Sequence, residues 1–201
     1  MTNKGKLIVI CGIDGSGKTT LEDGIAHCLR EQGINVLQTK QPSDRYRNDP
    51  NVRSYLDKGT SGISMEAMAL LSAYDRITHI EEVILPALES GTWVLCNRYV
   101  YSAIAYFKHR GVDVEFVKSI NSKIIQADYA FLTDLPASIA SERVKARDGS
   151  TAKFEEKNIE FMESVRNTLL EDFPHNYHVL DGTLSKSDLL SQAMDILKNE
   201  I

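Results

Sequence analysis

The segment that most constrains this chain is Gly12-Ile13-Asp14-Gly15-Ser16-Gly17-Lys18-Thr19, which satisfies the pattern G-x-x-x-x-G-K-[ST]. It follows the apolar run Leu7–Cys11 and precedes an amphipathic helical pattern over Lys18–Glu31. In such a strand–loop–helix unit, glycines let backbone N–H groups point inward, and the helix N-terminus favours an anion. The sequence therefore predicts a loop that binds the phosphates of a nucleoside triphosphate.

Short apolar runs alternate with helical patterns along the whole chain. Uninterrupted apolar strands separated by helices indicate a parallel sheet that is covered on both faces. We therefore expect an α/β fold: a P-loop NTPase three-layer sandwich with a five-stranded parallel sheet and helices on both faces, in a single domain over residues 1–201. Strands are expected at 7–11, 35–40, 92–96, 129–133 and 177–180, and helices at 18–31, 64–88, 113–126, from Pro136 to about Arg147, 154–173 and 187–199.

The composition excludes several classes of protein. Lysine and arginine number 23 against 28 acidic residues, a net charge of −5, which argues against a dedicated nucleic-acid surface. The cysteines Cys11, Cys28 and Cys96 are odd in number and lack metal-like spacing, which favours free thiols in a reducing compartment. The N-terminal apolar run is too short for a signal peptide or a membrane span. We expect a cytoplasmic protein that binds neither nucleic acid nor membrane.

Five segments of the chain carry a family pattern: GIDGSGKTT at 12–20, the stretch around Pro42, LLSAYDR at 70–76, NRYVYSAIAY at 97–106 and ERVKAR at 142–147. Together they resemble the thymidylate kinases, which phosphorylate dTMP with ATP. The resemblance covers nearly the whole chain and implies a nucleoside monophosphate kinase that uses ATP and Mg²⁺ to convert dTMP to dTDP. It also implies a homodimer.

The phosphate loop is expected to bind the donor nucleotide. Lys18 would reach the β- and γ-phosphates, and the Thr19 hydroxyl would ligate Mg²⁺. Asp14 resembles the acid that contacts the 3′-hydroxyl of the acceptor; the alternative is a side chain turned to solvent. The loop after the fifth strand, residues 181–183, is expected to hold the adenine. The ATP site is expected to include Gly12, Asp14, Gly15, Ser16, Gly17, Lys18, Thr19, Thr20, Arg143 and Thr183.

The acceptor is expected at the carboxyl end of the sheet. Arg98 directly follows the third strand, where a guanidinium can fork two phosphate oxygens. The resemblance implies that Arg98 clamps the acceptor phosphate, Arg76 reaches the pyrimidine carbonyl and Tyr106 excludes a ribose 2′-hydroxyl. Arg45 or Arg47 could bind the same phosphate, or both could belong to a solvated loop. The acceptor site is expected to include Asp14, Pro42, Arg45, Ser72, Arg76, Arg98, Tyr99, Ala103 and Tyr106.

Three positions depart from the family pattern. Asn97 stands in place of an acid that helps to position Mg²⁺, so it can only accept a hydrogen bond from a metal-bound water. Ser72 replaces an aromatic residue that stacks on thymine, and Ala103 replaces a polar residue that reads the base edge. A 5-modified dUMP or another nucleoside monophosphate is therefore an alternative acceptor.

Residues 143–155 are expected to form a short lid, the alternative being an ordinary surface turn. Arg143 and Arg147 share a helical face, where either nucleotide phosphates or the acids Glu142 and Asp148 would neutralise them. The resemblance favours the phosphates, with Arg147 and Lys153 as the donors of charge. The expected catalytic residues are thus Asp14, Lys18, Arg98, Arg147 and Lys153. An alternative of another class is a regulatory NTP-binding protein with little turnover.

Overall fold

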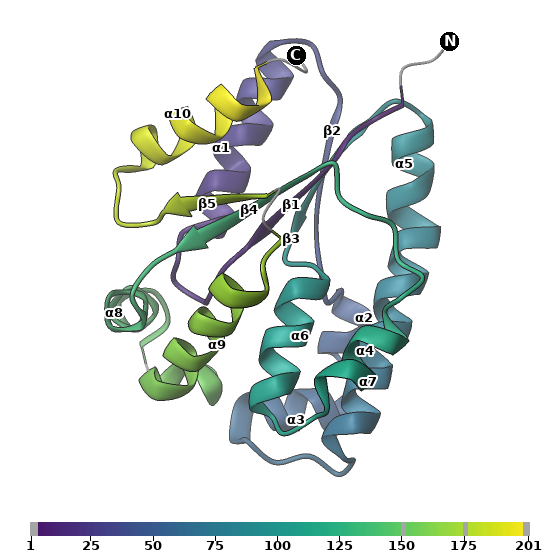
Figure 1. The fold of residues 1–201 in the computed structure, drawn as a ribbon, viewed down its shortest axis with the longest axis vertical. Coiled ribbons are helices and arrows are strands. Elements are labelled where there is room, and N and C mark those ends of the chain that lie inside the picture. Colours follow the sequence, from purple (N-terminus) through teal and green to yellow (C-terminus); the bar gives the residue numbers. More distant parts are fainter. Residues whose placement is uncertain (1–3, 150–151, 175–176, 199–201) are drawn as a thin grey trace.

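The computed structural model describes residues 4–149, 152–174 and 177–198, and it is built around a five-stranded sheet (Figure 1). The spatial order of the strands is β2-β3-β1-β4-β5, and every neighbouring pair is parallel. The predicted five-stranded parallel sheet is confirmed. The strands are β1 (Leu7–Cys11), β2 (Val36–Lys40), β3 (Trp93–Asn97), β4 (Tyr129–Asp134) and β5 (His178–Asp181).

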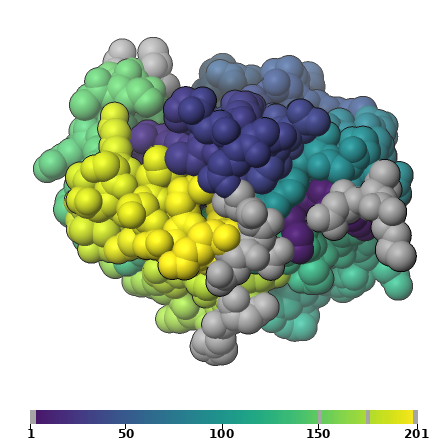
Figure 2. Space-filling view, turned by 90° about the horizontal axis from the view of Figure 1, so that it is seen from above, coloured from purple at the N-terminus to yellow at the C-terminus, as the bar shows by residue number. Residues whose placement is uncertain are grey.

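The central strand β1 is fully buried on both faces, and its alternating side chains show which helices cover each face. Ile8 and Ile10 pack against α1 (Lys18–Glu31) and α10 (Lys186–Leu197). Leu7 and Val9 face the opposite layer, which contains α5 (Leu85–Glu89), α6 (Val100–His109) and α9 (Ile159–Asp172). Figure 2 shows the first layer from above, with α10 in yellow beside the purple and blue region of α1 and β2. The sheet thus has helices on both faces, as expected.

A further group of helices stands below the sheet in Figure 1 and surrounds its own small core. That core joins Tyr46, Met68, Ala103, Phe107 and Val117. The remaining helical segments are α8 (Ala137–Asp148) and the 3₁₀ turn η3 (Glu155–Lys157). The group comprises α2 (Asp44–Arg47), α3 (Pro50–Lys58), α4 (Met65–His79) and α7 (Val114–Ile120) together with α6.

The predicted helix over 64–88 is continuous but not uniform. It consists of α4, a π-helical stretch η1 (Ile80–Ile84) and α5. Pro86 lies at the start of α5, and its ring would clash with the carbonyl four residues earlier in an ordinary helix. The wider π turn just before it relieves that clash.

Other helix predictions were too long, or were not made. The helix predicted at 113–126 ends at Ile120, because the Asn121 amide turns back to the Val117 carbonyl and binds Arg76. The helix predicted at 154–173 is interrupted by Asn158, whose side chain caps α9. The sequence did not predict α2, α3 or α6. Of the last predicted helix, position 199 lies outside the described residues.

In the part of the chain that the structure describes, no helix is both long and apolar enough to cross a membrane.

Candidate functional site

The predicted phosphate loop curls between β1 and α1. Gly15 and Gly17 both adopt positive φ, 84° and 95°, a conformation that side chains other than glycine rarely accept. A Cβ atom at Gly15 would also lie 2.3 Å from the Ala140 carbonyl oxygen. The buried Ser16 hydroxyl is hydrogen-bonded to Thr133 at 2.6 Å, and the Ser16 backbone N–H donates to the Ile13 carbonyl at 3.2 Å. The loop is therefore shaped by close packing against β4 and α8.

Lys18 is the charged group at the centre of this loop. Its Nζ donates to the Ile13 carbonyl at 2.7 Å, and its side chain is buried. Burial and the nearby Arg98 guanidinium lower the pKa of Lys18 to about 7, against the opposing effect of Asp14. An anion beside Nζ would restore the charge, which suits a site for phosphate.

A wide hollow, here called the loop cleft, opens in front of the phosphate loop. Its walls include Arg143 and Arg147 from α8 and Gly182 from the β5–α10 connection. Arg143 donates to the Gly182 carbonyl at 3.2 Å, which joins α8 to that connection. Thr183 does not line the cleft, because its hydroxyl donates to Asp181 at 2.6 Å, whereas its neighbours Gly182 and Leu184 do line it. The cleft is also lined by Asp14, Gly15, Ser16, Gly17, Lys18, Thr19, Thr20, Glu22, Lys40, Arg47, Asn97, Arg98 and Lys186.

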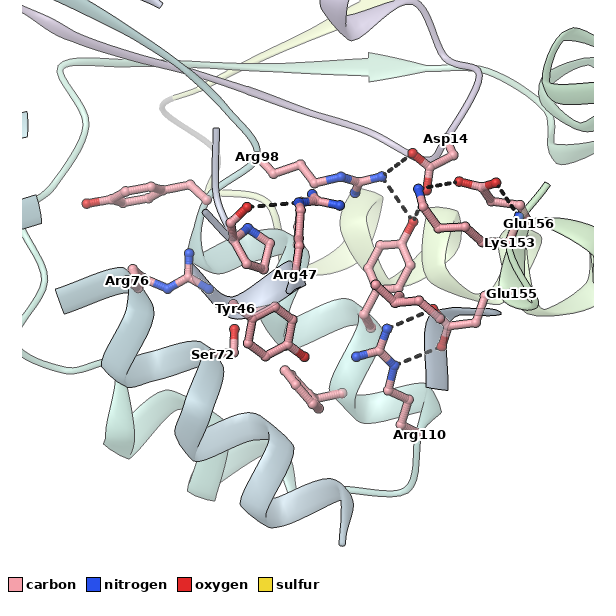
Figure 3. A pocket seen from close by; sticks show the side chains of 17 residues that line it. Asp14, Tyr46, Arg47, Ser72, Arg76, Arg98, Arg110, Lys153, Glu155 and Glu156 are labelled. Atoms are coloured by element: carbon pink, nitrogen blue, oxygen red, sulfur yellow. Dashed lines mark hydrogen bonds and ion pairs between the residues drawn. The ribbon is translucent and has the colours of Figure 1, made fainter. Parts of the chain in front are cut away.

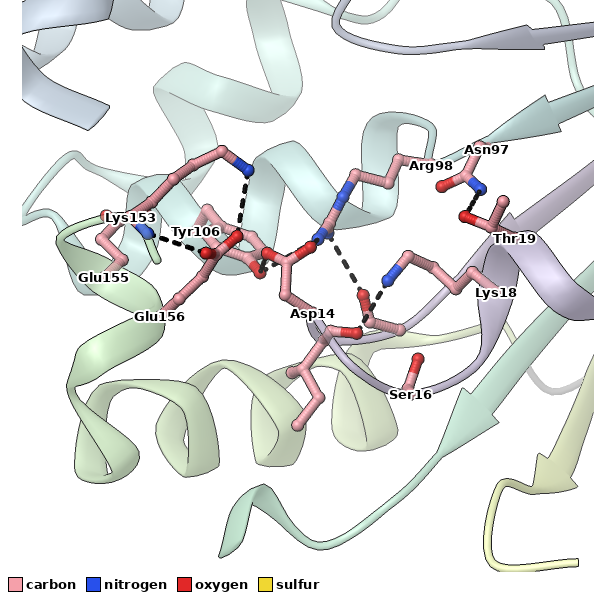
Figure 4. Close-up of polar contacts among 12 residues, drawn as sticks. Asp14, Ser16, Lys18, Thr19, Asn97, Arg98, Tyr106, Lys153, Glu155 and Glu156 are labelled. Carbon is pink, nitrogen blue, oxygen red and sulfur yellow. Dashed lines mark hydrogen bonds and ion pairs between the residues drawn. The ribbon is translucent and has the colours of Figure 1, made fainter. Parts of the chain in front are cut away.

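Three polar side chains meet at one edge of the loop cleft. The Asn97 amide nitrogen donates to Glu22 Oε2 at 2.8 Å and lies 3.4 Å from Thr19 Oγ1 (Figure 4). Glu22 follows Thr19 by one helical turn, so both point the same way. Burial raises the pKa of Glu22, while the hydrogen bond from Asn97 lowers it. The sequence did not single out Glu22, although its spacing from Thr19 was a signal.

A second hollow, the inner cavity, lies between the sheet end and the lower helices (Figure 3). Arg76 lines it and is almost fully buried. Its guanidinium donates to Asn121 Oδ1 at 2.9 Å and to Gln41 Oε1 at 2.7 Å. Both partners are neutral amides, so they orient Arg76 without neutralising it. The cavity is lined by Asp14, Pro42, Tyr46, Arg47, Leu56, Ser72, Arg76, Arg98, Tyr99, Ser102, Ala103, Tyr106, Phe107, Arg110, Lys153, Glu155 and Glu156.

Asp14, Arg47 and Arg98 line both hollows and form the wall that they share. Arg98 binds Asp14 at 2.7 Å, and its second contacts are the Gly12 carbonyl and the Tyr106 hydroxyl. Burial opposes the ionisation of Asp14, but Arg98, Lys18 and Lys153 outweigh it and lower the Asp14 pKa. Asp14 is thus a carboxylate surrounded by cations.

The structure corrects the choice of Arg45. That side chain is half exposed and pairs with Glu82 at 2.9 Å and Thr78 at 2.7 Å, away from both hollows. Arg47 points the other way, into the shared wall, where its Nε donates to the Pro42 carbonyl at 3.0 Å. Among the described residues no carboxylate forms an ion pair with Arg47, and burial together with Arg98 lowers its pKa. Two neighbouring guanidinium groups with one carboxylate between them favour a bound anion.

The predicted lid brings its basic residues to different places. Arg147 borders the loop cleft but pairs with its neighbour Asp148 at 2.6 Å. Lys153 borders the inner cavity instead and pairs with Glu156 at 3.0 Å. Positions 150 and 151 of the lid lie outside the described residues.

A buried ion pair anchors the end of the predicted lid. Arg110, the residue after α6, donates to both oxygens of Glu155, at 2.8 and 2.7 Å, and Tyr55 also donates to Glu155. The sequence did not predict this pair, because 45 residues separate its members.

Comparison with known proteins decides the family. The model of the thymidylate kinase family matches residues 10–193. The chain belongs to the thymidylate kinase family. Among curated relatives, a probable thymidylate kinase of Pyrococcus horikoshii is 38% identical over 98% of both chains. A thymidylate kinase of Desulfovibrio desulfuricans is 30% identical over 93% of this chain and 92% of its own.

Most of the site residues predicted for this thymidylate kinase family member surround the two hollows. Pro42, Ser72, Tyr99, Ala103 and Tyr106 line the inner cavity. The hydrogen-bond donor of Tyr99 is already used within the protein, because its hydroxyl donates to the Ile125 carbonyl at 2.8 Å. Gly12 lies behind the loop, with its carbonyl bound by Arg98. The roles of these residues stay predictions, and the sequence did not single out Glu22, Arg110 or Glu155, which also border the two hollows.

Proposed function

We propose that this protein transfers the γ-phosphoryl group of ATP to the 5′-phosphate of dTMP, giving dTDP and ADP. The observation that carries the proposal is the wall of Asp14, Arg47 and Arg98, common to the loop cleft and the inner cavity. A donor in one hollow and an acceptor in the other would bring their phosphates together at this wall. In-line phosphoryl transfer needs this positioning and little else. The names of the relatives support the same reaction.

The donor side fits a magnesium-bound triphosphate. Its candidate ligands, Thr19 and Asn97, offer hard oxygen atoms, and the described residues hold no cluster of three or more acidic, histidine or cysteine ligands. Mg²⁺ is commonly bound in this way, through few protein atoms, phosphates and waters. A Mg²⁺ ion held by Thr19 would supply positive charge that offsets the charge of the phosphates. Lys18 and the loop N–H groups would hold the same phosphates, with Arg143 and Arg147 closing over them.

The acceptor side fits a deoxynucleoside monophosphate. We assign the acceptor phosphate to Arg98 and Arg47, and the base carbonyl to Arg76, whose orientation is already fixed by its two amide partners. Asp14 would contact the sugar 3′-hydroxyl, and Tyr106, bonded to Arg98, would close the space beside the 2′-carbon. Lys153 would add positive charge near Asp14 as transfer proceeds. The homodimer and the cytoplasmic location stay predictions.

One observation favours a second acceptor, a 5-modified dUMP. The buried hydroxyls of Ser72 and Ser102 have no hydrogen-bond partner among the described residues, and both residues line the inner cavity. An unpaired buried hydroxyl favours a ligand that brings a polar group to it. A polar substituent on the base would meet this requirement.

A coupled assay of ADP release tests the proposal, with ATP fixed and dTMP, dUMP, 5-hydroxymethyl-dUMP, dCMP and dAMP as acceptors. We expect the highest kcat/KM with dTMP or the 5-modified dUMP. Lys18→Ala should abolish turnover with an unchanged circular dichroism spectrum. Arg98→Ala should lower kcat by roughly 10²–10³-fold and raise the acceptor KM, because it removes charge from the developing transition state.

Arg53→Ala is the matched control for the arginine change. Arg53 lines neither hollow and forms an exposed ion pair with Asp57, so its loss should leave the kinetics unchanged. ATP hydrolysis at the same rate with and without every acceptor would contradict the proposal and favour a regulatory NTP-binding protein.

A further inference from the structure

Glu22 is a buried carboxylate for which the chain itself supplies no positive charge. Its residue is only 5% exposed, and it borders the loop cleft. Its hydrogen-bond donors are the neutral amides of Asn97, at 2.8 Å, and Gln38, and no lysine, arginine or histidine among the described residues forms an ion pair with it. Burying an ionised carboxylate is costly unless a cation compensates it. The nearby phosphates of a nucleotide would add repulsion, so a bound cation is needed between them.

The same contact fixes the direction of the Asn97 side chain. A carboxylate only accepts hydrogen bonds, so the amide nitrogen of Asn97 must face Glu22. The same nitrogen lies 3.4 Å from Thr19 Oγ1, and the amide oxygen lies on the side of Arg98 in Figure 4. Without Glu22 the Asn97 amide could adopt either of its two orientations, with the nitrogen or the oxygen in the position that now faces Glu22.

We propose that Glu22 is a positioning residue for the divalent cation of the nucleotide, an inference that rests on the proposed function. Glu22 supplies the negative charge that Asn97 lacks, and it fixes the orientation of the Asn97 amide beside the metal that Thr19 would bind. Carboxylates that orient metal ligands in this way change metal affinity by 10–100-fold in other proteins. The charge of the metal site is thus carried by helix α1 rather than by the end of strand β3.

Glu22→Gln separates this role from a merely structural one. Glutamine keeps the size and an oxygen that accepts from Asn97, but it removes the charge. Calorimetric titration of Mg²⁺ into the complex with ADP should show about 10-fold weaker binding than in the unaltered protein. ADP without any divalent cation should bind as well or better, since a repulsive charge is gone. Equal Mg²⁺ affinity in both proteins would overturn the inference.

Asp23→Asn is the matched control. Asp23 is the next residue of α1, exposed and outside the cleft, where its carboxylate accepts from Gln38. It removes the same formal charge, so it should leave Mg²⁺ affinity within about 2-fold. A loss as large as that of Glu22→Gln would mean that distant charge alone is responsible, and would also overturn the inference.

A double variant tests whether a carboxylate at residue 97 can replace the carboxylate at residue 22. Asn97→Asp combined with Glu22→Gln returns a carboxylate to strand β3 and keeps the hydrogen bond, so Mg²⁺ affinity should recover to within about 3-fold. Asn97→Asp alone puts two carboxylates within hydrogen-bond reach, so it should lower the melting temperature without Mg²⁺ and recover with it. No recovery in the double variant would contradict a role of charge. None of these measurements needs an acceptor, so absence of ADP binding would instead refute the proposed function.

Discussion

Lys18 lies in the phosphate loop with its charge only partly retained. Its pKa is lowered to about 7, first by burial and then by Arg98, so at pH 8 most of the free protein carries a neutral lysine. A phosphate beside Nζ favours the charged form and would raise that pKa again. Nucleotide binding at pH 8 should therefore take up most of one proton, and the ADP dissociation constant should rise as the pH increases above 7.

Calorimetry of ADP binding in buffers of different ionisation enthalpy measures this uptake. At pH 8 the ADP phosphates are already ionised, since phosphate groups titrate near pH 6, so the proton must come to the protein. Lys18→Arg should abolish the uptake, because arginine stays protonated. Heats that do not depend on the buffer at pH 8 would show that Lys18 is charged in the free protein.

Three buried serine hydroxyls without partners offer a comparison within the one protein. Ser72 and Ser102 line the inner cavity, whereas Ser141 of α8 does not. An unpaired buried hydroxyl costs roughly 1–3 kcal/mol, so replacing any of the three by alanine should raise the melting temperature of the free protein. Only Ser72→Ala and Ser102→Ala should also raise the acceptor KM, by about 5-fold or more for a base with a polar 5-substituent. An unchanged KM in both would exclude these hydroxyls from base recognition.

Residue roles were predictable from the sequence where a motif fixed the geometry, and not elsewhere. Lys18, Thr19 and Arg98 have positions dictated by the loop and by the strand end. Arg45 and Arg47 lie two residues apart on a short helix, which turns them about 200° from each other. The sequence could not tell which of them faces the cavity. The sequence alone could not assign a role to Glu22, because its contact with Asn97 joins residues that are 75 positions apart.

At the scale of elements, burial and length explain two of the helices that the sequence did not predict. Helix α6 is buried on both sides, because it places Ala105 against the sheet layer and Ala103 with Phe107 in the lower core. Helix α2 has only 4 residues, too few to show a helical period. Strands β1, β3 and β4 were predictable because each contains a short, continuous apolar run.

The ion pair between Arg110 and Glu155 joins η3 to α6 and is buried on both sides. Removing one member of a buried pair leaves an uncompensated charge and typically costs 3–5 kcal/mol. Glu155→Ala should therefore lower the melting temperature by about 10 °C and speed amide hydrogen exchange at residues 153–158. Glu115→Ala is the control, because it breaks only the exposed pair with Lys118 and should shift the melting temperature by less than about 2 °C. Similar small shifts in both variants would show that the buried pair does not hold this segment.

At the scale of the whole molecule, a chain of net charge −5 concentrates cations in its cleft. Lys18, Arg98, Arg143 and Arg147 border the loop cleft, with Asp14 and Glu22 as its acids. A basic cleft in an acidic molecule attracts anionic nucleotides and directs them to this one place.

Helix α4 connects this site to the predicted homodimer. Its outer side exposes Leu70 by 49% and Tyr74 by 59%, one turn apart, while Ser72 and Arg76 of the same helix line the inner cavity. Large apolar side chains clustered on one helix face favour burial against a partner, and α4 of a second copy would supply that partner surface.

The double change Leu70→Glu and Tyr74→Glu should convert the predicted dimer to a species of the 22.5 kDa chain mass in sedimentation velocity. It should also raise the acceptor KM, because α4 would lose the support that fixes Arg76. Val179→Glu, which alters an exposed residue of β5, should leave both the mass and the KM unchanged. An unaltered protein that sediments at the single-chain mass at all concentrations would refute the dimer and, with it, this role of α4.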